Sequence, residues 1–208
     1  MKTIKPFKNR NELLENWALT QPRQACEVGV QAGEYSKKIL TTMSSLSKFY
    51  AIDGWVTQKN YSDPANTTKE QFTRYFEMTK TNLAPWEEKV EILRGDSLDM
   101  VHKISDSSLD FIYIDARHDY VGCTQDLEAY WSKLKKGGLF SGHDYIKAPY
   151  TLGHFGDWTL CVDGTRNPRA VKGAVNDFAE THGLQVVVSY DDRHTDNTMF
   201  HSWAIVKQ

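Results

Sequence analysis

Short hydrophobic runs alternate with amphipathic stretches along most of the chain. Seven of these runs have the length and composition of buried strands. They lie at residues 25–29, 49–53, 90–93, 110–114, 139–141, 184–189 and 203–206. Strands that alternate with helices form mostly parallel sheets, because each connection has to cross a face of the sheet. The pattern therefore predicts an α/β fold with a mostly parallel seven-stranded sheet and helices on both faces.

Three stretches between the runs have the periodicity of helices. Hydrophobic residues recur at three- and four-residue steps in residues 35–46, 127–134 and 171–178. This spacing places the hydrophobic side chains on one face of a helix. We expect these faces to pack on the sheet.

Several residues predict where helices begin and end. Thr68 and Gln71 have the spacing of a capping box, which favours a helix start. Gly183 is typical of a residue that follows a helix, and so is the pair Gly137 and Gly138 after a lysine-rich segment. We expect a helix to end at each of these two places.

Composition and charge exclude several classes of protein. The chain has 208 residues, with 25 Lys and Arg against 27 Asp and Glu, for a formal charge of −2. Nucleic-acid-binding domains usually have a basic excess, so we expect no nucleic-acid partner. The hydrophobic stretches are far shorter than the roughly 18 residues of a membrane span, and the N-terminus lacks the apolar segment of a secretory signal. We therefore predict a cytoplasmic protein without membrane contacts.

The chain has the length of one domain and contains neither a repeat nor a linker-like segment. We expect a single domain over residues 1–208, with an N-terminal helical extension at 1–24 and a core at 25–207. Its three cysteines, Cys26, Cys123 and Cys161, lack CxxC spacing. This scattered set indicates reduced thiols.

The first predicted strand ends in a glycine-containing turn. Glu27, Gly29 and Gly33 form the pattern ExGxxxG, which leads into a predicted helix. Ligands of open parallel sheets bind at the carboxyl ends of the strands, and glycine lets the backbone approach them closely. The spacing differs from the GxGxxG of dinucleotide sites. Taken alone, the turn is either part of a small-molecule site or a plain connection.

Carboxylates follow the second and third predicted strands. Asp53 ends the second strand, 24 residues after Gly29. A carboxylate at this place can accept hydrogen bonds from both hydroxyls of a ribose. Asp96 and Ser97 end the third strand and are suited to an adenine amino group. We expect these side chains along the same edge of the sheet.

Two later segments carry a more specific pattern. Residues 113–120 read YIDARHDY, and residues 137–145 read GGLFSGHDY. Residues 126–131 and 134–138, DLEAYW and LKKGG, lie between the two strand ends. Together with the glycine turn, this ordered set resembles the class I S-adenosylmethionine-dependent methyltransferases, specifically methyltransferase family 24. The resemblance covers roughly residues 25–207.

The resemblance implies a Rossmann-like class I methyltransferase fold and S-adenosylmethionine as cofactor. It implies that the cofactor is bound at strand ends, by Glu27, Gly29, Gly33, Asp53, Asp96, Ser97 and Asp115. Segments near 56–85 and 146–168 have no clear counterpart in the family, so we expect them to face the substrate. The expected reaction is O-methylation of a small hydroxylated acceptor, such as a sugar or a phenol.

Two other functions stay open from the sequence. The methyl acceptor could be a group on a protein, lipid or nucleic acid, which a basic or apolar surface around the site would favour. Alternatively, the chain is a non-catalytic homologue that binds S-adenosylmethionine, although the intact Glu27, Gly29, Asp53 and Asp115 argue against this. Whether the chain forms a homo-oligomer is also open from the sequence.

Residues after the fourth and fifth strands are candidates for the acceptor side. Asp115, His118, His143 and Asp144 are expected to converge at the sheet edge. Related catechol and sugar O-methyltransferases hold magnesium with a carboxylate at the position of Asp115 and an acidic or amide pair at the next strand end. The resemblance thus implies His118 as general base, aided by Asp115, and a divalent metal, Mg²⁺ or Mn²⁺, on Asp115, His143 and Asp144.

His143 departs from the family pattern, because those relatives have an oxygen ligand there. Mg²⁺ tolerates imidazole poorly, so His143 either shifts the preference toward Mn²⁺, Fe²⁺ or Zn²⁺ or is not a ligand. In the alternative without metal, Asp115 and Asp144 accept hydrogen bonds from backbone and His143 caps or packs. Independently of this, His118 is either the general base or an exposed turn residue.

Aromatic residues are concentrated in the two inserted segments. One group either covers the acceptor or packs on the sheet edge, and comprises Tyr145, Tyr150, His154, Phe155 and Trp158. A second group is expected on the core face of an added helix, and comprises Trp55, Tyr61, Phe72, Tyr75 and Phe76. Residues 191–194, with the sequence DDRH, are expected in a solvated hairpin tip rather than a metal site.

Overall fold

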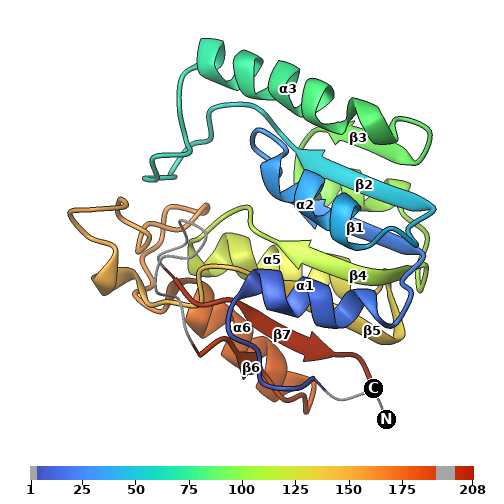
Figure 1. The fold of residues 1–208 in the computed structure, drawn as a ribbon. Helices are drawn as coiled ribbons and strands as arrows, with labels where there is room; N and C mark the ends of the chain where they lie inside the picture. Colours follow the sequence, from blue (N-terminus) through green and yellow to red (C-terminus); the bar gives the residue numbers. More distant parts are fainter. Residues whose placement is uncertain (1–3, 191–199) are drawn as a thin grey trace.

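The computed structural model describes residues 4–190 and 200–208, and a single sheet runs through it (Figure 1). Its strands are β1 (Gln24–Val28), β2 (Lys48–Asp53), β3 (Val90–Arg94), β4 (Leu109–Ile114), β5 (Leu134–Gly142), β6 (Val187–Val188) and β7 (Trp203–Val206). They lie in the order β3-β2-β1-β4-β5-β7-β6. The first five in this order are parallel, whereas β7 is antiparallel to β5 and β6. The predicted mostly parallel seven-stranded sheet is confirmed.

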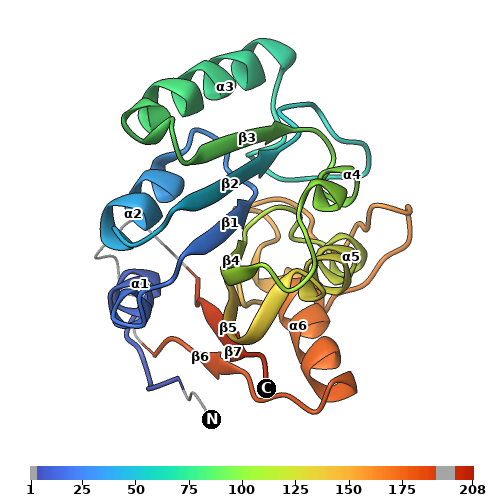
Figure 2. The same ribbon diagram turned by 90° about the vertical axis from the view of Figure 1, so that its right-hand side faces the viewer.

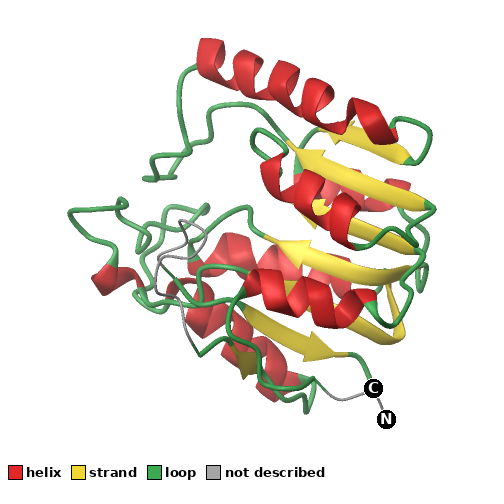
Figure 3. Ribbon diagram, viewed as in Figure 1, coloured by secondary structure: helices red, strands yellow, loops and turns green. Residues whose placement is uncertain are grey.

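Helices cover both faces of the sheet, as the end-on view in Figure 2 shows. One face carries α1 (Arg10–Ala18), α2 (Glu34–Thr42) and α3 (Lys69–Leu83), and the other carries α4 (Ser97–Met100), α5 (Tyr120–Trp131) and α6 (Ala170–Thr181). Short 3-10 helices follow at Ala84–Trp86, Val101–Lys103 and Ala148–Tyr150. Figure 3 shows that the long loops gather at one end of the sheet.

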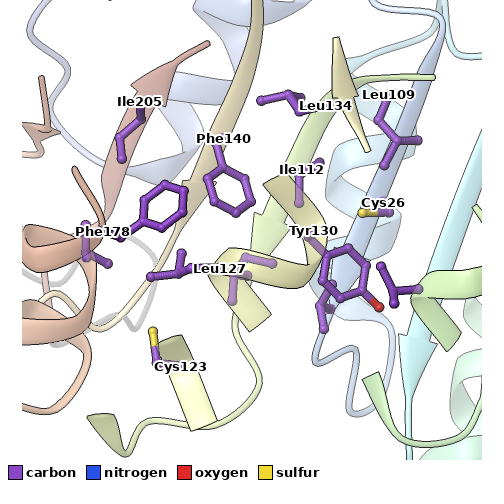
Figure 4. Packing of buried hydrophobic residues seen from close by; sticks show 14 of the residues in the cluster. Cys26, Leu109, Ile112, Cys123, Leu127, Tyr130, Leu134, Phe140, Phe178 and Ile205 are labelled. Carbon is purple, nitrogen blue, oxygen red and sulfur yellow. The ribbon is translucent and has the colours of Figure 1, made fainter. Parts of the chain in front are cut away.

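A separate hydrophobic cluster fills each interface between the sheet and its helices. The cluster beneath α5 and α6 includes Ile112, Phe140 and Phe178, as well as the buried Cys26 and Cys123 (Figure 4). The second cluster joins α1 and α2 to the other face of the sheet. The central strands are buried on both faces, and their side chains point alternately into the two clusters. Their sequences are therefore continuous hydrophobic runs.

Two predicted helix boundaries are confirmed. Thr68 is the N-cap of α3, and its side chain accepts a hydrogen bond from the backbone N–H of Gln71 at 3.2 Å. At the end of α6, Gly183 has a φ of +63°. The N–H of Leu184 then donates to the carbonyl of Ala179 at 2.8 Å, which satisfies a carbonyl of the last turn.

The helix end predicted at Gly137 and Gly138 is wrong, because both residues lie inside β5. The helix α5 ends earlier, at Trp131. The glycines serve an irregular start of the strand. The register with β4 shifts after Leu109, and Gly137 has a φ of +74°. A bulged strand and a helix end both favour glycine, so the sequence did not distinguish them.

Two further expectations need correction. The run at 184–189 forms only the short strand β6, which pairs with β7 at Val187 and Val188. In the described sheet β7 is its one neighbour, so β6 is an edge strand. Trp55 and Tyr61 precede α3 and do not belong to its core face. Trp55 still packs on the helix, with its ring 4.9 Å from that of Phe76. Residues 191–194 lie outside the described residues.

Candidate active site

A cavity of about 600 Å³ opens at the carboxyl ends of the parallel strands. Figure 1 shows β2 and β4 pointing toward the end of the sheet where the long loops gather. The cavity is lined by residues that follow β1, β2, β3 and β4. The sequence-predicted residues among them are Glu27, Gly29, Asp53, Asp96, Ser97, Asp115 and His118. The structure thus brings most of the predicted set into one space.

Gly29 allows β1 and β4 to converge at the floor of the cavity. Its φ is +92°, and an added Cβ would lie 1.9 Å from the carbonyl oxygen of Asp115. The N–H of Asp115 also donates to the carbonyl of Val28 at 2.7 Å. Both the left-handed conformation and the close approach require glycine at this place.

Gly33 has a structural role at the start of α2. It is the N-cap of the helix, with a φ of +80°. An added Cβ would meet the backbone of Thr79 in α3 at 3.2 Å. Gly33 therefore lets α2 and α3 approach each other, and it is not among the residues that line the cavity.

Asp53 is fixed by backbone donors from both sides. Its Oδ2 accepts from the N–H of Gln31 at 2.8 Å, and its Oδ1 accepts from the N–H of Trp55 at 2.8 Å. Burial raises the pKa of this carboxyl, while these backbone N–H groups act in the opposite direction. The bond to Gln31 ties the end of β2 to the glycine turn after β1.

Glu27 is almost fully buried, with 1% of its surface exposed. The hydroxyl of Ser36 in α2 donates to its carboxyl. Burial raises the pKa of Glu27 to about 8, and the negative charges of Asp115 and Asp53 act in the same direction. Near neutral pH this side chain is therefore mainly protonated, and it can donate a hydrogen bond as well as accept one.

The end of β3 is connected to α5 through a residue that the sequence analysis missed. Asp96 caps α4 by accepting from the N–H of Leu98 at 2.9 Å. The next side chain, Ser97, donates its hydroxyl to Asp126. Burial raises the pKa of Asp126 to about 7, and the residue also lines the cavity. Its place in a helical pattern gave no sign of this role.

His118 lies between carboxylates from three segments. Its Nδ1 is 2.9 Å from Asp63, and its Nε2 is 3.0 Å from Asp144 and 3.6 Å from Asp115. Ligand atoms of Asp115, His118 and Asp144 all lie within 4.8 Å of one another, close enough to hold one metal ion. The sequence prediction had placed His143, not His118, in this set.

The charges in this cluster are strongly coupled. Burial by itself would lower the pKa of His118, but Tyr61 and Asp144 and the contact with Asp115 raise it well above its usual value. Burial would raise the pKa of Asp144, yet His143 and His118 hold it well below its usual range. The imidazole of His118 is therefore charged in this arrangement, and the carboxyl of Asp144 is ionised.

His143 lies beside the cluster rather than inside it. Its Nδ1 is 2.8 Å from Asp144. A second, small cavity of about 10 Å³ is lined by Asp115, His118, His143 and Trp203, among others. Among the described residues, Nε2 of His143 and Nε1 of Trp203 are buried without a hydrogen-bond partner. A space of this size is at the limit for one water molecule.

The two inserted segments meet above His118. Trp158 donates from its Nε1 to Asp63 at 2.7 Å, and its ring centroid lies 4.3 Å from that of His118. The hydroxyl of Tyr61 is 3.1 Å from the Nδ1 of the same histidine. Backbone packing joins the segments too, because a Cβ on Gly156 would lie 2.0 Å from the carbonyl oxygen of Ser62. We name residues 54–68 and 145–168 together the roof.

Aromatic residues of the second roof segment do not act as one group. Trp158 alone among those predicted contacts His118, whereas Phe155 packs on Phe200 with ring centroids 5.1 Å apart. Tyr145 donates to Asn176 in α6, and Tyr150 is exposed. Asp63 is not predictable as a site residue from the sequence, because an aspartate in a polar loop is common. Its closeness to His118 depends on how the roof folds.

A sequence-family model described as a methyltransferase domain matches residues 26–145, which is more than half of the chain. The chain belongs to this family. The match runs from within β1 to Tyr145, and it includes β2 to β5, the glycine turn and both strand ends that carry the histidines. The protein is a class I S-adenosylmethionine-dependent methyltransferase, as the resemblance implied.

Solved structures of O-methyltransferases share the fold of this methyltransferase. One from Bacillus cereus, solved with S-adenosylhomocysteine, is 15% identical with a TM-score of 0.62, and the match covers 95% of this chain and 80% of the other. TomG from Streptomyces achromogenes, an O-methyltransferase involved in tomaymycin synthesis, was solved with S-adenosylmethionine. It is 16% identical with a TM-score of 0.58, and the match covers 96% of this chain and 80% of TomG. These identities show a common fold.

A spermidine synthase from Thermotoga maritima has the same architecture, with 16% identity and a TM-score of 0.55 over 94% of this chain and 57% of the other. The fold therefore does not specify the reaction by itself. Comparison with curated proteins found no match. Within the described part of the methyltransferase, each helix is too short or too polar to cross a membrane.

Proposed function

We propose that this methyltransferase moves the methyl group of S-adenosylmethionine to an oxygen of a small hydroxylated acceptor, such as a sugar or a phenol. One observation carries the proposal. His118 lines the same cavity as Gly29 and Asp53, so a proton acceptor and a cofactor site share one space. The roof segments 54–68 and 145–168 reach the same histidine, and we propose that they select the acceptor.

Asp53 and the residues after β3 would bind the adenosine part of the cofactor. Asp53 is oriented by the N–H groups of Gln31 and Trp55, and a carboxylate at the end of the second strand suits the ribose hydroxyls. Asp96 lines the next part of the cavity, toward β3. The sulfonium and the methionine then extend toward β1 and β4, where Glu27 and Asp115 lie.

Methyl transfer requires a nucleophile in line with the carbon–sulfur bond. The acceptor oxygen forms a bond to the methyl carbon, the carbon–sulfur bond breaks, and S-adenosylhomocysteine leaves. The proton of the acceptor hydroxyl must go to a base, and His118 is placed to take it on Nε2. Asp63 on Nδ1 and Asp144 beside Nε2 then hold the imidazolium that results. The same carboxylates keep His118 charged at rest, so turnover has to begin with the loss of that proton.

The residues present fit a divalent cation. Two carboxylates and one imidazole converge at Asp115, His118 and Asp144. A mixed oxygen and nitrogen set suits Mn²⁺, Fe²⁺ or Zn²⁺ better than Mg²⁺. A cation bound there would lower the pKa of an acceptor hydroxyl, and His118 would then be a ligand of the cation instead of the base. We propose His143 as a partner that orients Asp144, because its Nδ1 contacts that carboxylate.

The test is transfer of labelled methyl groups from S-adenosylmethionine to matched panels of hydroxyl, amine and thiol compounds. Each panel is run after dialysis against a chelator and again after Mn²⁺ or Mg²⁺ is added back. Turnover confined to hydroxyl compounds would support the proposal, and transfer confined to amines or thiols would refute it. Recovery on adding Mn²⁺ would support the cation site, whereas full activity in chelator would assign the proton transfer to His118 without metal.

A further inference from the structure

We infer that Arg10 binds the carboxylate of the methionine part of S-adenosylmethionine. The inference rests on the proposed function, since it assumes that this cofactor occupies the larger cavity. Arg10 is the first residue of α1 and lines that cavity. It lies outside the residues 26–145 that match the family, and the pattern of hydrophobic positions gives no reason to select it.

The sheet order places Arg10 at the correct end of the cavity. Strand β1 lies between β2 and β4, so a ligand that begins at Asp53 on β2 passes Gly29 on β1 and ends near Asp115 on β4. With the ribose at Asp53, the methionine part extends to β4. The Nη1 of Arg10 is 3.9 Å from Asp115 Oδ2, at that end.

The charges around the cavity point to the same partner. The methionine part carries a positive sulfonium, a positive ammonium and a negative carboxylate. Carboxylates at this end suit the two positive groups, but the carboxylate of the ligand needs a cation. Of the other cationic lining residues, Arg117 directs all three nitrogens to Asp119, Gln58 and Asn60, and Lys59 lies in the exposed loop after β2. Arg10 reaches the same end of the cavity from α1, where it forms an ion pair with Asp115 at 3.9 Å.

The guanidinium of Arg10 is held in place before any ligand arrives. Its Cζ lies 4.5 Å from the centroid of the Tyr35 ring, and the hydroxyl of Tyr35 donates to the carbonyl of Arg10 at 3.4 Å. Tyr35 in turn packs on Tyr113, with ring centroids 4.4 Å apart. A planar guanidinium fixed on an aromatic face loses little freedom when it binds a carboxylate through two hydrogen bonds.

The experiment compares two ligands that differ in one group. Isothermal titration measures the Kd of S-adenosylmethionine and of decarboxylated S-adenosylmethionine, which keeps the sulfonium and the amine. The proteins are the wild type, Arg10→Met, Arg10→Lys and the control Arg74→Met on the exposed side of α3. A charge-assisted pair is worth about 1.5 to 3 kcal/mol, so Arg10→Met should weaken S-adenosylmethionine about 10- to 100-fold.

The decarboxylated ligand should bind Arg10→Met within about threefold of the wild type, because the group that Arg10 contacts is missing. Arg10→Lys should recover part of the affinity, and Arg74→Met should change neither Kd. Equal weakening of both ligands, or unchanged binding of S-adenosylmethionine, would overturn the inference while the proposed cofactor stands. Failure of the wild type to bind S-adenosylmethionine would overturn both.

Discussion

The proposed cofactor side and the proposed acceptor side of the site are built in different ways. The cofactor side consists of strand ends and a glycine turn, where backbone groups hold Asp53 and where β1 and β4 touch at Gly29. The acceptor side consists of side chains, with His118 held by Asp63 from one roof segment and by Asp144 after β5. Backbone contacts tolerate little change, whereas a cluster of charges responds to pH, to ligands and to cations. The first side is therefore fixed by backbone contacts, and the second by the charges of its side chains.

The largest expected effect separates catalysis from cofactor binding. Replacing His118 with Asn removes the proposed proton acceptor, so kcat should fall about 100- to 10,000-fold for any acceptor found in the panels. The Kd of S-adenosylhomocysteine should change less than threefold. The control His102→Asn, in an exposed 3-10 helix, should behave like the wild type. A kcat within threefold of the wild type would remove His118 from the mechanism.

A second change tests the rigidity of the cofactor side. Gly29→Ala forces a Cβ into the carbonyl of Asp115 and a non-glycine residue into positive φ. We expect a loss of about 3 kcal/mol or more in the free energy of unfolding, measured with denaturant. Gly153→Ala is the matched control, because Gly153 has a φ of +84° with open space around its missing Cβ. This variant should lose only about 1 to 2 kcal/mol in the free energy of unfolding. Equal losses in the two variants would show that the backbone at Asp115 moves to make room for the Cβ.

A smaller effect is expected in the roof. Asp63→Asn keeps the shape of the side chain but removes the charge beside Nδ1 of His118. We expect kcat to fall about tenfold, the lower end of the effect of losing a carboxylate that orients a functional histidine. The Kd of S-adenosylhomocysteine should not change, and neither should the kinetics of Asp163→Asn, at an exposed turn of the other roof segment. A change confined to cofactor binding would assign Asp63 to the cofactor side of the site and remove it from the support of His118.

The last prediction concerns pH and the buried acid of the proposed cofactor side. The folded protein keeps Glu27 protonated up to a pKa of about 8, whereas the unfolded chain releases this proton near 4.5. The contribution of Glu27 to the free energy of unfolding should therefore be largest below pH 4.5. It should decline as pH rises toward 8, by up to about 1.4 kcal/mol per pH unit. Glu27→Gln should flatten this decline relative to Glu77→Gln on α3. An identical slope in both variants would mean that Glu27 is ionised in the fold.

The convergence of strand ends on the proposed cofactor side was largely predictable from the sequence because its signals are local. ExGxxxG, an acid after the second strand and Asp96 after the third each depend on a few neighbouring residues, and the topology of a parallel sheet brings such strand ends together. Gly33 shows where this reasoning stops. Its spacing was correct for a turn, but its contact is with Thr79 of α3 rather than with the cavity.

The acceptor side was only partly predictable. Asp115, His118 and Asp144 were expected to converge, and they do. The sequence predicted His143 in the set of candidate metal ligands, but the structure has His118 there. Which histidine takes this place depends on how the two rings are oriented, which hydrophobic periodicity does not encode. Asp63 and Trp158 are 95 residues apart in sequence and share a hydrogen bond. A contact of this kind leaves no trace in spacing, because it depends on how two long loops pack.

The sequence by itself determined the α/β architecture, the family and the strand ends that line the cavity, since hydrophobic period and glycine placement act over a few residues. The tertiary structure decided which side chains face one another: Arg10 beside Asp115, Asp63 against His118, and Asp126 beneath Ser97. These pairs join segments that only the packing of the whole chain brings together. Burial then sets their charge, because the pKa of an acid such as Glu27 depends on how much water the surrounding fold excludes.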